Sequence, residues 1–315
     1  MAGKFLRSFG IALGALALTT GLALAGTGQP SPGEIGLQGS VTPIMDSIHS
    51  FHDGVLLWVE ILISLLVAAL LLVIIVRFNA RANPTPQRFT HNTLLEVVWT
   101  ALPVIILVII AIPSFAVLTD QLTMPDGVRK YLGKDIFSFG SVEVPAVGLT
   151  IKATGSQWYW NYTYIADPNV AGSADKNFDS NILDEKTRLA STPVQPRLLA
   201  VDNMLVVPVD TTVRVEVTGT DVIHAFAVPS FGIIIDAVPG RLNETWFNAR
   251  KVGVYYGQCR ELCGKDHAFM PIAVRVVPKD VYATWQKALQ AGSVQDANKT
   301  LPALTQADVS DQPAA

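Results

Sequence analysis

Charge is scarce in this sequence. Asp, Glu, Lys and Arg make up 16% of the 315 residues, half of the residues are hydrophobic, and the mean hydropathy is +0.37. This composition is too apolar for an ordinary soluble protein and predicts a membrane protein in contact with a lipid bilayer. The formal net charge of −3 excludes the basic surface of a nucleic-acid-binding protein. The sequence has no Cys-x-x-Cys-His motif, which excludes a covalently attached c-type haem in this chain.

Cysteine is equally scarce, and both cysteines lie in one short stretch. Cys259 and Cys263 are followed by His267 and Met270. Thiolate, imidazole and thioether are the ligands that copper prefers. A mononuclear blue-copper site uses one cysteine, so two thiolates separated by three residues cannot both be terminal ligands of one such site, but they could bridge two copper ions. Each ion would then take one histidine, and His224, in an apolar, strand-like run, is the candidate for the second.

A disulfide between the two cysteines is the alternative. An even number of cysteines in an exported domain favours pairing. A disulfide gives no reason, however, for His267 and Met270 to follow four and seven residues after Cys263. We therefore favour a metal site.

Residues 1–25 have the pattern of a secretory signal peptide. Lys4 and Arg7 precede a mostly apolar run, and Ala23-Leu24-Ala25 fits the small-x-small cleavage pattern. An uncleaved membrane anchor is the alternative, but the run is short and rich in Gly, Ala and Thr, which favours cleavage. Residues 26–53 then form the N-terminal segment of the exported protein.

Two apolar runs are long enough to cross a bilayer. Residues 54–76 contain one charge, Glu60, and at 1.5 Å per residue they extend about 34 Å as a helix. Residues 97–118 contain no charge, and their two prolines are tolerated in membrane helices. The sequence therefore predicts a transmembrane helical hairpin over residues 54–118.

The distribution of arginine predicts the orientation of this hairpin. The connection between the spans has three arginines, whereas residues 26–53 have no Lys or Arg. By the positive-inside rule the connection is cytoplasmic, and the N-terminus and everything after Leu118 lie outside. Together with the bacterial type of signal, this predicts a multi-pass protein of a bacterial inner membrane with its outer domain in the periplasm.

After a connector at residues 119–147, the hydrophobic pattern changes to short alternating runs. Many short strands suggest a β-sandwich or Greek-key barrel over residues 148–285, which makes the fold class an α+β membrane protein. The expected strands are 149–153, 158–165, 198–207, 212–217 and 273–277. We expect a polar surface excursion at 167–197, a short helix at 279–290, and a C-terminal tail at 286–315 that is disordered after Ala291.

Several motifs between roughly residues 45 and 285 resemble those of cytochrome c oxidase subunit II. They are Gln157-Trp158-Tyr159-Trp160, Val201-Asp202-Asn203, Asp221-Val222-Ile223-His224, the run from Asp236 to Asn243, and the run from Tyr255 to Pro271. The resemblance implies a cupredoxin-like outer domain and the electron-transfer subunit of a haem-copper respiratory oxidase. In such an oxidase cytochrome c gives electrons to a dinuclear copper A centre, which passes them to haem in subunit I. Oxygen reduction to water and proton pumping take place there, and subunits I and III are the implied partners.

The resemblance also implies the ligands of the two copper ions. Two thiolates would bridge them, each ion would take one histidine, and a thioether and a backbone carbonyl would complete the shell. The bridging thiolates would be those of Cys259 and Cys263, and the histidines would be His224 and His267. The thioether would be that of Met270, and the backbone carbonyl that of Glu261.

Other implied roles concern the surfaces around the copper site. The carboxylate of Glu261 would bind Mg²⁺ or Mn²⁺ at the contact with subunit I, the alternative being a simple hydrogen-bond acceptor. Trp158 would admit the electron from cytochrome c, although an aromatic residue on a strand is more often part of a core. The sequence also places Trp160 on the same face of that strand. Asp221 and Asp236 are candidates for steering a basic cytochrome, or turn and strand-edge residues.

Glu96 has two interpretations. The run Thr93-Leu94-Leu95-Glu96 predicts a capping box at the start of the second membrane helix. By resemblance, Glu96 aligns with a glutamate at the cytoplasmic mouth of a proton path into subunit I. Both roles are compatible.

Three other functions compete with this interpretation. A quinol oxidase subunit of the same architecture would lack the copper ligands that are present here. A membrane-tethered copper carrier would favour exposed, exchangeable ligands. A nitrous oxide reductase uses the same copper centre, but a two-span hairpin before the domain does not suit it.

Overall fold

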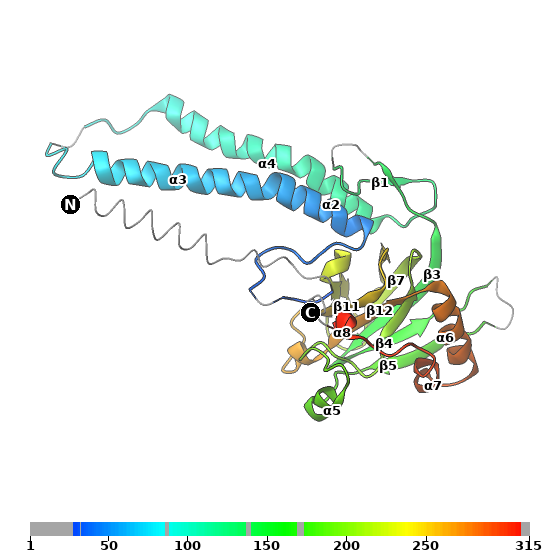
Figure 1. Cartoon of the computed structure of the whole chain (residues 1–315). Helices are drawn as coiled ribbons and strands as arrows, with labels where there is room; N and C mark the ends of the chain where they lie inside the picture. Colours follow the sequence, from blue (N-terminus) through cyan, green and yellow to red (C-terminus); the bar gives the residue numbers. More distant parts are fainter. Residues whose placement is uncertain (1–27, 32, 86–87, 137–139, 169–172, 310–315) are drawn as a thin grey trace.

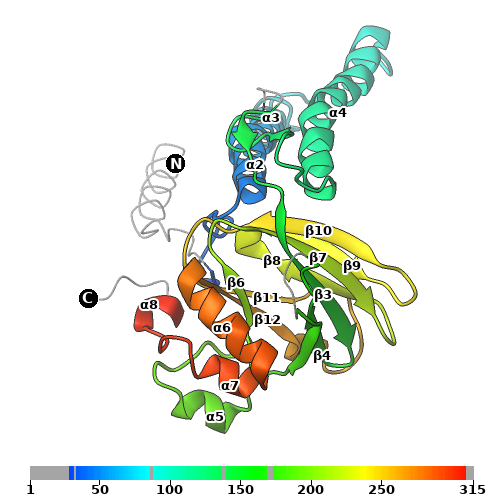
Figure 2. The ribbon, with the colours of Figure 1, turned by 90° about the vertical axis from the view of Figure 1, so that its right-hand side faces the viewer.

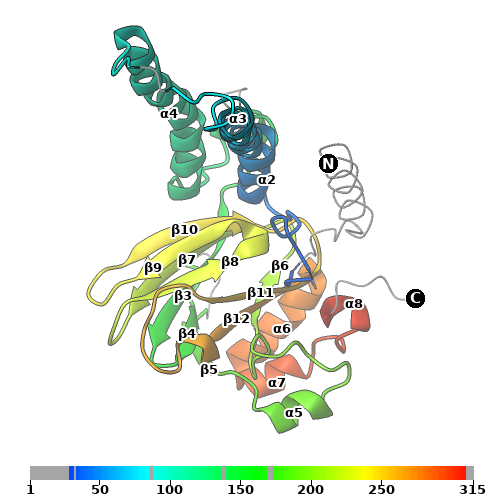
Figure 3. The same cartoon turned by 90° about the vertical axis from the view of Figure 1, so that its left-hand side faces the viewer.

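Two long helices form an antiparallel hairpin at one end of the molecule, and a β-rich domain forms the other (Figure 1). The computed structural model describes residues 28–31, 33–85, 88–136, 140–168 and 173–309. The predicted signal peptide at residues 1–25 lies outside this range. The hairpin stands at one end of the β-domain, on the side of β10, as Figures 2 and 3 show from opposite directions.

The first helix of the hairpin is longer than its apolar core. It runs without a break through α2 (Pro43–Phe51), the π-helical turn η1 (His52–Leu56) and α3 (Leu57–Arg77), over 35 residues in all. Thr42 caps its start, since the Thr42 hydroxyl accepts the Met45 N–H at 3.1 Å. The apolar span predicted from residue 54 is therefore only part of this helix, which begins at Pro43.

The second helix, α4 (Thr93–Leu122), has 30 residues. Both helices are long and apolar enough to cross a membrane, and the side chains of α3 are exposed along its length. The predicted capping box is present, but its N-cap is Asn92 rather than Thr93. The Asn92 side chain accepts the Leu95 N–H at 3.2 Å, and the Glu96 carboxylate accepts the Asn92 N–H at 3.1 Å.

Two five-stranded sheets face each other in the β-domain. The first consists, in pairing order, of β10 (Asn243–Asn248), β7 (Thr212–Gly219), β3 (Val147–Ser156), β4 (Tyr159–Tyr164) and β5 (Lys176–Ser180). The second consists of β6 (Leu205–Pro208), β12 (Pro271–Val277), β11 (Gly253–Cys259), β8 (His224–Val228) and β9 (Ile233–Ala237). A small pair, β1 (Lys130–Tyr131) with β2 (Val142–Glu143), lies in the connector.

The strands alternate as a half-buried sheet requires. In β7, Val213, Val215 and Val217 are fully buried, and the polar residues between them face outward. The core between the sheets is rich in aromatic side chains, among them Trp160, Tyr162, Phe226, Trp246 and Phe247. This arrangement confirms the predicted β-sandwich.

Three local predictions are wrong. The strand expected from residue 158 begins at Tyr159, because Gln157 and Trp158 form the turn between β3 and β4. The strand expected at 198–207 is reduced to β6. The expected excursion at 167–197 contains β5, which extends the first sheet, and the helix α5 (Glu185–Ala190).

The predicted helix at 279–290 is α6 (Lys279–Ala291), but the expectation of disorder beyond it is wrong for residues 292–309. Here α7 (Val294–Asn298) and α8 (Gln306–Val309) follow, and α7 packs beside α6 (Figure 2). Val294 and Ala297 are buried, and the Trp285 indole donates to the Asn298 side chain at 3.0 Å. A few apolar residues within polar sequence are enough to hold this segment on the domain.

Buried carboxylates connect the hairpin to the β-domain. Asp46 on α2 pairs with Arg250 at 2.7 Å, and Asp120 on α4 pairs with Arg129 at 3.1 Å. The indole of Trp246 on β10 donates to the Asp120 carbonyl at 2.9 Å. These contacts set the position of the β-domain relative to the two helices.

Candidate metal centre

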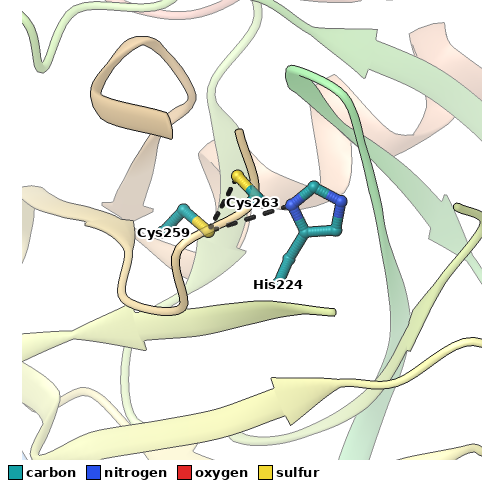
Figure 4. Close-up of side chains that lie close together, drawn as sticks. All are labelled: His224, Cys259 and Cys263. Carbon is teal, nitrogen blue, oxygen red and sulfur yellow. Dashed lines mark hydrogen bonds between the residues drawn. The ribbon is translucent and has the colours of Figure 1, made fainter. Parts of the chain in front are cut away.

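The two cysteines come from one connection of the second sheet. Cys259 is the last residue of β11, and Cys263 lies in the loop that leads through η3 (His267–Phe269) to β12. His224 is the first residue of β8, the antiparallel neighbour of β11, in which Phe226 pairs with Cys259. Sheet pairing therefore brings His224 beside the thiols, although it lies 35 residues earlier in the chain (Figure 4).

The sulfur atoms are close but not bonded. The Cys259 and Cys263 Sγ atoms are 3.9 Å apart, and both residues are buried as free thiols. A disulfide would require a separation of about 2.05 Å. His224 Nδ1 lies 3.9 Å from Cys259 Sγ, and the ligand atoms of these three residues all lie within 4.8 Å of one another. The geometry is that of a soft-metal site rather than a disulfide.

The remaining expected donors lie around the same two sulfurs. His267 Nδ1 is 3.4 Å and Met270 Sδ is 3.5 Å from Cys263 Sγ. The Glu261 carbonyl oxygen is 3.3 Å from Cys259 Sγ. Met270 is buried and His267 is half-buried, so the cluster lies under the surface of the loop.

The electrostatics of the two thiols suit a bound cation. Burial tends to raise the pKa of Cys259, but hydrogen bonds to His224 and to nearby backbone groups outweigh it and lower that pKa. Burial and the negative charge of Cys259 raise the pKa of Cys263 to about 12. Ionisation of one thiol thus opposes ionisation of the other. A metal cation between them removes this conflict, so the residues fit the copper pair that the sequence predicts.

Asp221 orients His224 from the side away from the sulfurs. Its carboxylate lies 2.9 Å from His224 Nε2, which leaves Nδ1 directed at Cys259. The second carboxylate oxygen accepts the backbone N–H of Gln157 at 2.8 Å. Carboxylate–histidine pairs of this kind fix the ring and the tautomer of metal ligands. Asp221, a candidate for the docking surface or a turn residue, is exposed, and its carboxylate is engaged by His224 and Gln157.

His224 is also held from the opposite sheet. Gly155 on β3 lies against its ring, and a Cβ atom at position 155 would be 3.0 Å from the imidazole. The indole of Trp160 contacts the same ring edge-on at 6.2 Å and donates to the Met270 carbonyl at 3.4 Å. The sandwich core therefore supports the metal site.

Trp158 lies on the metal loop, not on the strand beside Trp160. Its indole is half-buried and donates to the Cys263 carbonyl at 3.3 Å, and the Gln157 side chain donates to the same oxygen at 2.8 Å. The glycine at 264, with φ +123°, allows this approach, because a Cβ atom there would be 3.0 Å from the indole. Gln157 and Gly264 belong to the motifs singled out in the sequence, but their spacing did not reveal this role.

The other predicted residues lie apart from the metal cluster. The side chain of Glu261 is exposed at the surface of the loop, and Asp236 is exposed on β9. Glu96 lies at the start of α4, at the end of the hairpin remote from the β-domain (Figure 1).

Comparison with known proteins agrees with these observations. The family model for the periplasmic domain of cytochrome c oxidase subunit II matches residues 149–277, and the model for its transmembrane domain matches residues 30–117. A probable cytochrome c oxidase subunit 2 of Rickettsia bellii is 45% identical over 275 residues, which cover 87% of this chain and 91% of the relative. Cytochrome c oxidase subunit 2 of Cereibacter sphaeroides is 39% identical over 287 residues, which cover 88% and 86% of the two chains.

Among solved structures, the periplasmic domain of subunit II of cytochrome oxidase of Bradyrhizobium japonicum is 57% identical to this chain. The match covers 47% of this chain and 97% of that one, with a TM-score of 0.40.

Proposed function

Because the chain belongs to the cytochrome c oxidase subunit II family, we propose that it carries electrons from cytochrome c, through a dinuclear copper A centre, to haem in subunit I. The chain is a subunit of a terminal oxidase and has the two apolar helices and cupredoxin-like domain of that family. Reduction of oxygen to water, coupled to proton pumping, would take place in subunit I.

The observation that carries the proposal is the convergence of four donor atoms on the two cysteine sulfurs. Cys259 and Cys263 would bridge the metal ions, and His224 and His267 would each complete one ion. The Met270 thioether and the Glu261 carbonyl would be the weaker ligands. Two copper ions held in this way would supply a one-electron redox centre whose charge is shared between both ions.

Contacts from surrounding residues hold the ligand groups in place. Asp221 fixes the His224 ring, and the Trp160 indole holds the Met270 carbonyl. Cys259 and His224 begin or end paired strands, which move less than loops do. Little movement of the ligands means a small reorganisation cost for electron transfer.

Trp158 is the proposed point of electron entry. Its half-buried indole lies between the solvent and the metal loop, and the hydrogen bond to the Cys263 carbonyl connects the ring directly to a ligand residue. Asp236 is exposed and available to a basic docking partner. Asp221 is less available, because His224 and Gln157 already engage its carboxylate.

Two carboxylates would serve the partner subunit. The exposed side chain of Glu261 would bind Mg²⁺ or Mn²⁺ together with ligands from subunit I, since hard oxygen donors suit these ions. Glu96 would stand at the entrance of a proton path while it caps α4. Subunit III would complete the assembly.

The chain is a membrane protein by its two helices and its match to the transmembrane family. The excess of arginine between the spans supports an orientation with the N-terminus and the metal domain in the periplasm of a bacterial inner membrane. The signal-like pattern of residues 1–25 supports cleavage after Ala25.

Copper stoichiometry and electron paramagnetic resonance on the purified chain test the proposal. Two copper ions per chain that share one unpaired electron would produce a seven-line hyperfine pattern. A single copper with a four-line pattern would contradict it and favour a mononuclear carrier. A chain that takes up no copper and oxidises to a Cys259–Cys263 disulfide would return the pair to a structural role.

A further inference from the structure

A lysine lies over the indole through which the electron is proposed to enter. The Lys265 ammonium nitrogen is 5.7 Å from the centroid of the Trp158 ring, within the range of a cation–π contact. The Lys265 side chain is 80% exposed, so its charge faces the solvent from which a donor arrives.

The loop backbone fixes this position. Lys265 directly follows Gly264, whose Cα approaches the Trp158 indole so closely that a Cβ would be 3.0 Å from it. Gln157 ties the same turn to the loop through the Cys263 carbonyl. Whatever rotamer Lys265 adopts, its side chain therefore begins beside the indole.

Nearby acids leave most of this positive charge uncompensated. A carboxylate oxygen of Asp266 is 4.0 Å from the Lys265 ammonium, at the limit of an ion pair, and the Lys265 side chain is largely in water while that of Asp266 is half-buried. The Asp221 carboxylate is engaged by His224 and by the Gln157 N–H. The entry point thus combines an aromatic surface with an available cation.

We propose that Lys265 is a specificity-determining residue for the electron donor and selects a c-type cytochrome that presents a carboxylate, not a lysine, opposite Trp158. This inference rests on the proposed electron entry at Trp158. A carboxylate on the donor would gain an exposed ion pair at the contact, whereas a lysine would meet a like charge. Selection would act on encounter and docking, and not on the copper centre itself.

The test compares two donors on the intact oxidase complex carrying Lys265→Gln or Lys265→Glu. One donor is a basic c-type cytochrome with lysines around its haem edge, and the other is an acidic c-type cytochrome. Second-order rates of electron entry and equilibrium binding of the oxidised donors are measured from low to high ionic strength. With the basic donor, Lys265→Glu should raise the rate and the affinity about two- to fivefold at low salt, and with the acidic donor it should lower both. Lys265→Gln should give about half of each effect. The effects of both variants should vanish at high salt.

The matched control is Lys279→Glu, the same charge change at the start of α6, beyond the end of β12 remote from the metal loop. Lys279→Glu should leave the rates and affinities of both electron donors unchanged. The proposal is overturned if Lys265→Glu and Lys279→Glu act alike, or if Lys265→Glu shifts both donors in the same direction. A wild-type complex whose copper accepts electrons from neither donor would instead contradict the proposed function.

Discussion

Cys259 and Cys263 differ in how readily they ionise, although only three residues separate them. His224 and nearby backbone groups lower the pKa of Cys259, and the resulting charge, with burial, raises the pKa of Cys263. Ionisation of one thiol therefore opposes ionisation of the other, and a bound cation would relieve this opposition. Each sulfur contributes to the metal site only together with the other.

Replacement of either cysteine by serine tests this dependence. Cys259→Ser or Cys263→Ser should abolish the seven-line copper signal, because a hydroxyl is a poor bridge for soft metal ions. The helical hairpin should still insert, since it lies far from the loop. Met270→Leu is the matched control, and a dinuclear copper signal should survive it with altered parameters, because the thioether is the weaker ligand. A normal signal in either serine variant would contradict the bridging assignment.

Trp158 is the second residue whose role can be isolated. Trp158→Phe keeps an aromatic ring but removes the N–H that donates to the Cys263 carbonyl. Electron entry from cytochrome c should slow by at least tenfold, with the copper spectrum unchanged, when measured by rapid mixing. Tyr159→Phe, on the neighbouring half-buried aromatic, should leave the rate unchanged. An unaltered rate in Trp158→Phe would assign that residue to packing alone.

Among the elements, α7 shows how a polar tail is held in place. Asn298 accepts a hydrogen bond from the fully buried Trp285 indole of α6 and donates to Asn203 at 3.3 Å. Asn203 in turn donates to the Asp179 carbonyl on β5 at 3.0 Å. This chain of hydrogen bonds connects the tail, the preceding helix and the edge of the first sheet.

Asn298→Ala should therefore destabilise the β-domain. It leaves a buried indole N–H without its partner, which costs about 1–3 kcal/mol. For a domain of this size, each 1 kcal/mol corresponds to a fall in Tm of roughly 2–4 °C. The Tm of the solubilised chain is measured by near-ultraviolet circular dichroism during thermal unfolding. Lys299→Ala, which breaks an exposed ion pair with Asp296, should change Tm little. Equal effects of the two variants would rule out a special role for Asn298.

At the scale of the whole molecule, the β-domain is fastened to the hairpin by buried charge. Asp46 is 6% exposed and is held by Arg250 at 2.7 Å and by the Ser40 hydroxyl at 2.7 Å. The backbone N–H of Arg250 also donates to the Val41 carbonyl at 3.0 Å. The segment before the first membrane helix is thus part of the interface that orients the metal site.

Arg250→Met should loosen this junction. It leaves the Asp46 carboxylate buried without its cation, at a cost of about 2–3 kcal/mol, below the range for fully buried pairs because Arg250 is partly exposed. Hydrogen exchange should increase over residues 40–46 while the copper signal is retained. Arg214→Met, which removes partly exposed pairs with Glu216 and Glu244, should leave that exchange unchanged. Exchange that is no faster in Arg250→Met would show that apolar contacts alone hold the junction.

Local sequence was sufficient for the features that depend on neighbouring residues. The hairpin follows from two apolar runs, the sandwich from period-two alternation, and the soft-metal chemistry from the ligand types in one loop. The errors lie where a few contacts outweigh composition. Residues 292–309 are ordered by buried Val294, Ala297 and the Asn298 network, which a polar composition conceals.

Contacts between distant segments could be decided only by the folded chain. Pairing of β8 with β11 brings His224 to Cys259, and the turn between β3 and β4 lays Trp158 on the Cys263 carbonyl, 105 residues away. The contact between this turn and the metal loop also puts Lys265 over the Trp158 indole. The reason is physical: side-chain period and ligand chemistry are local properties, whereas strand register and turn placement are set by packing of the whole core. A shift of one residue in the pairing of β8 with β11 would turn His224 to the other face of the sheet.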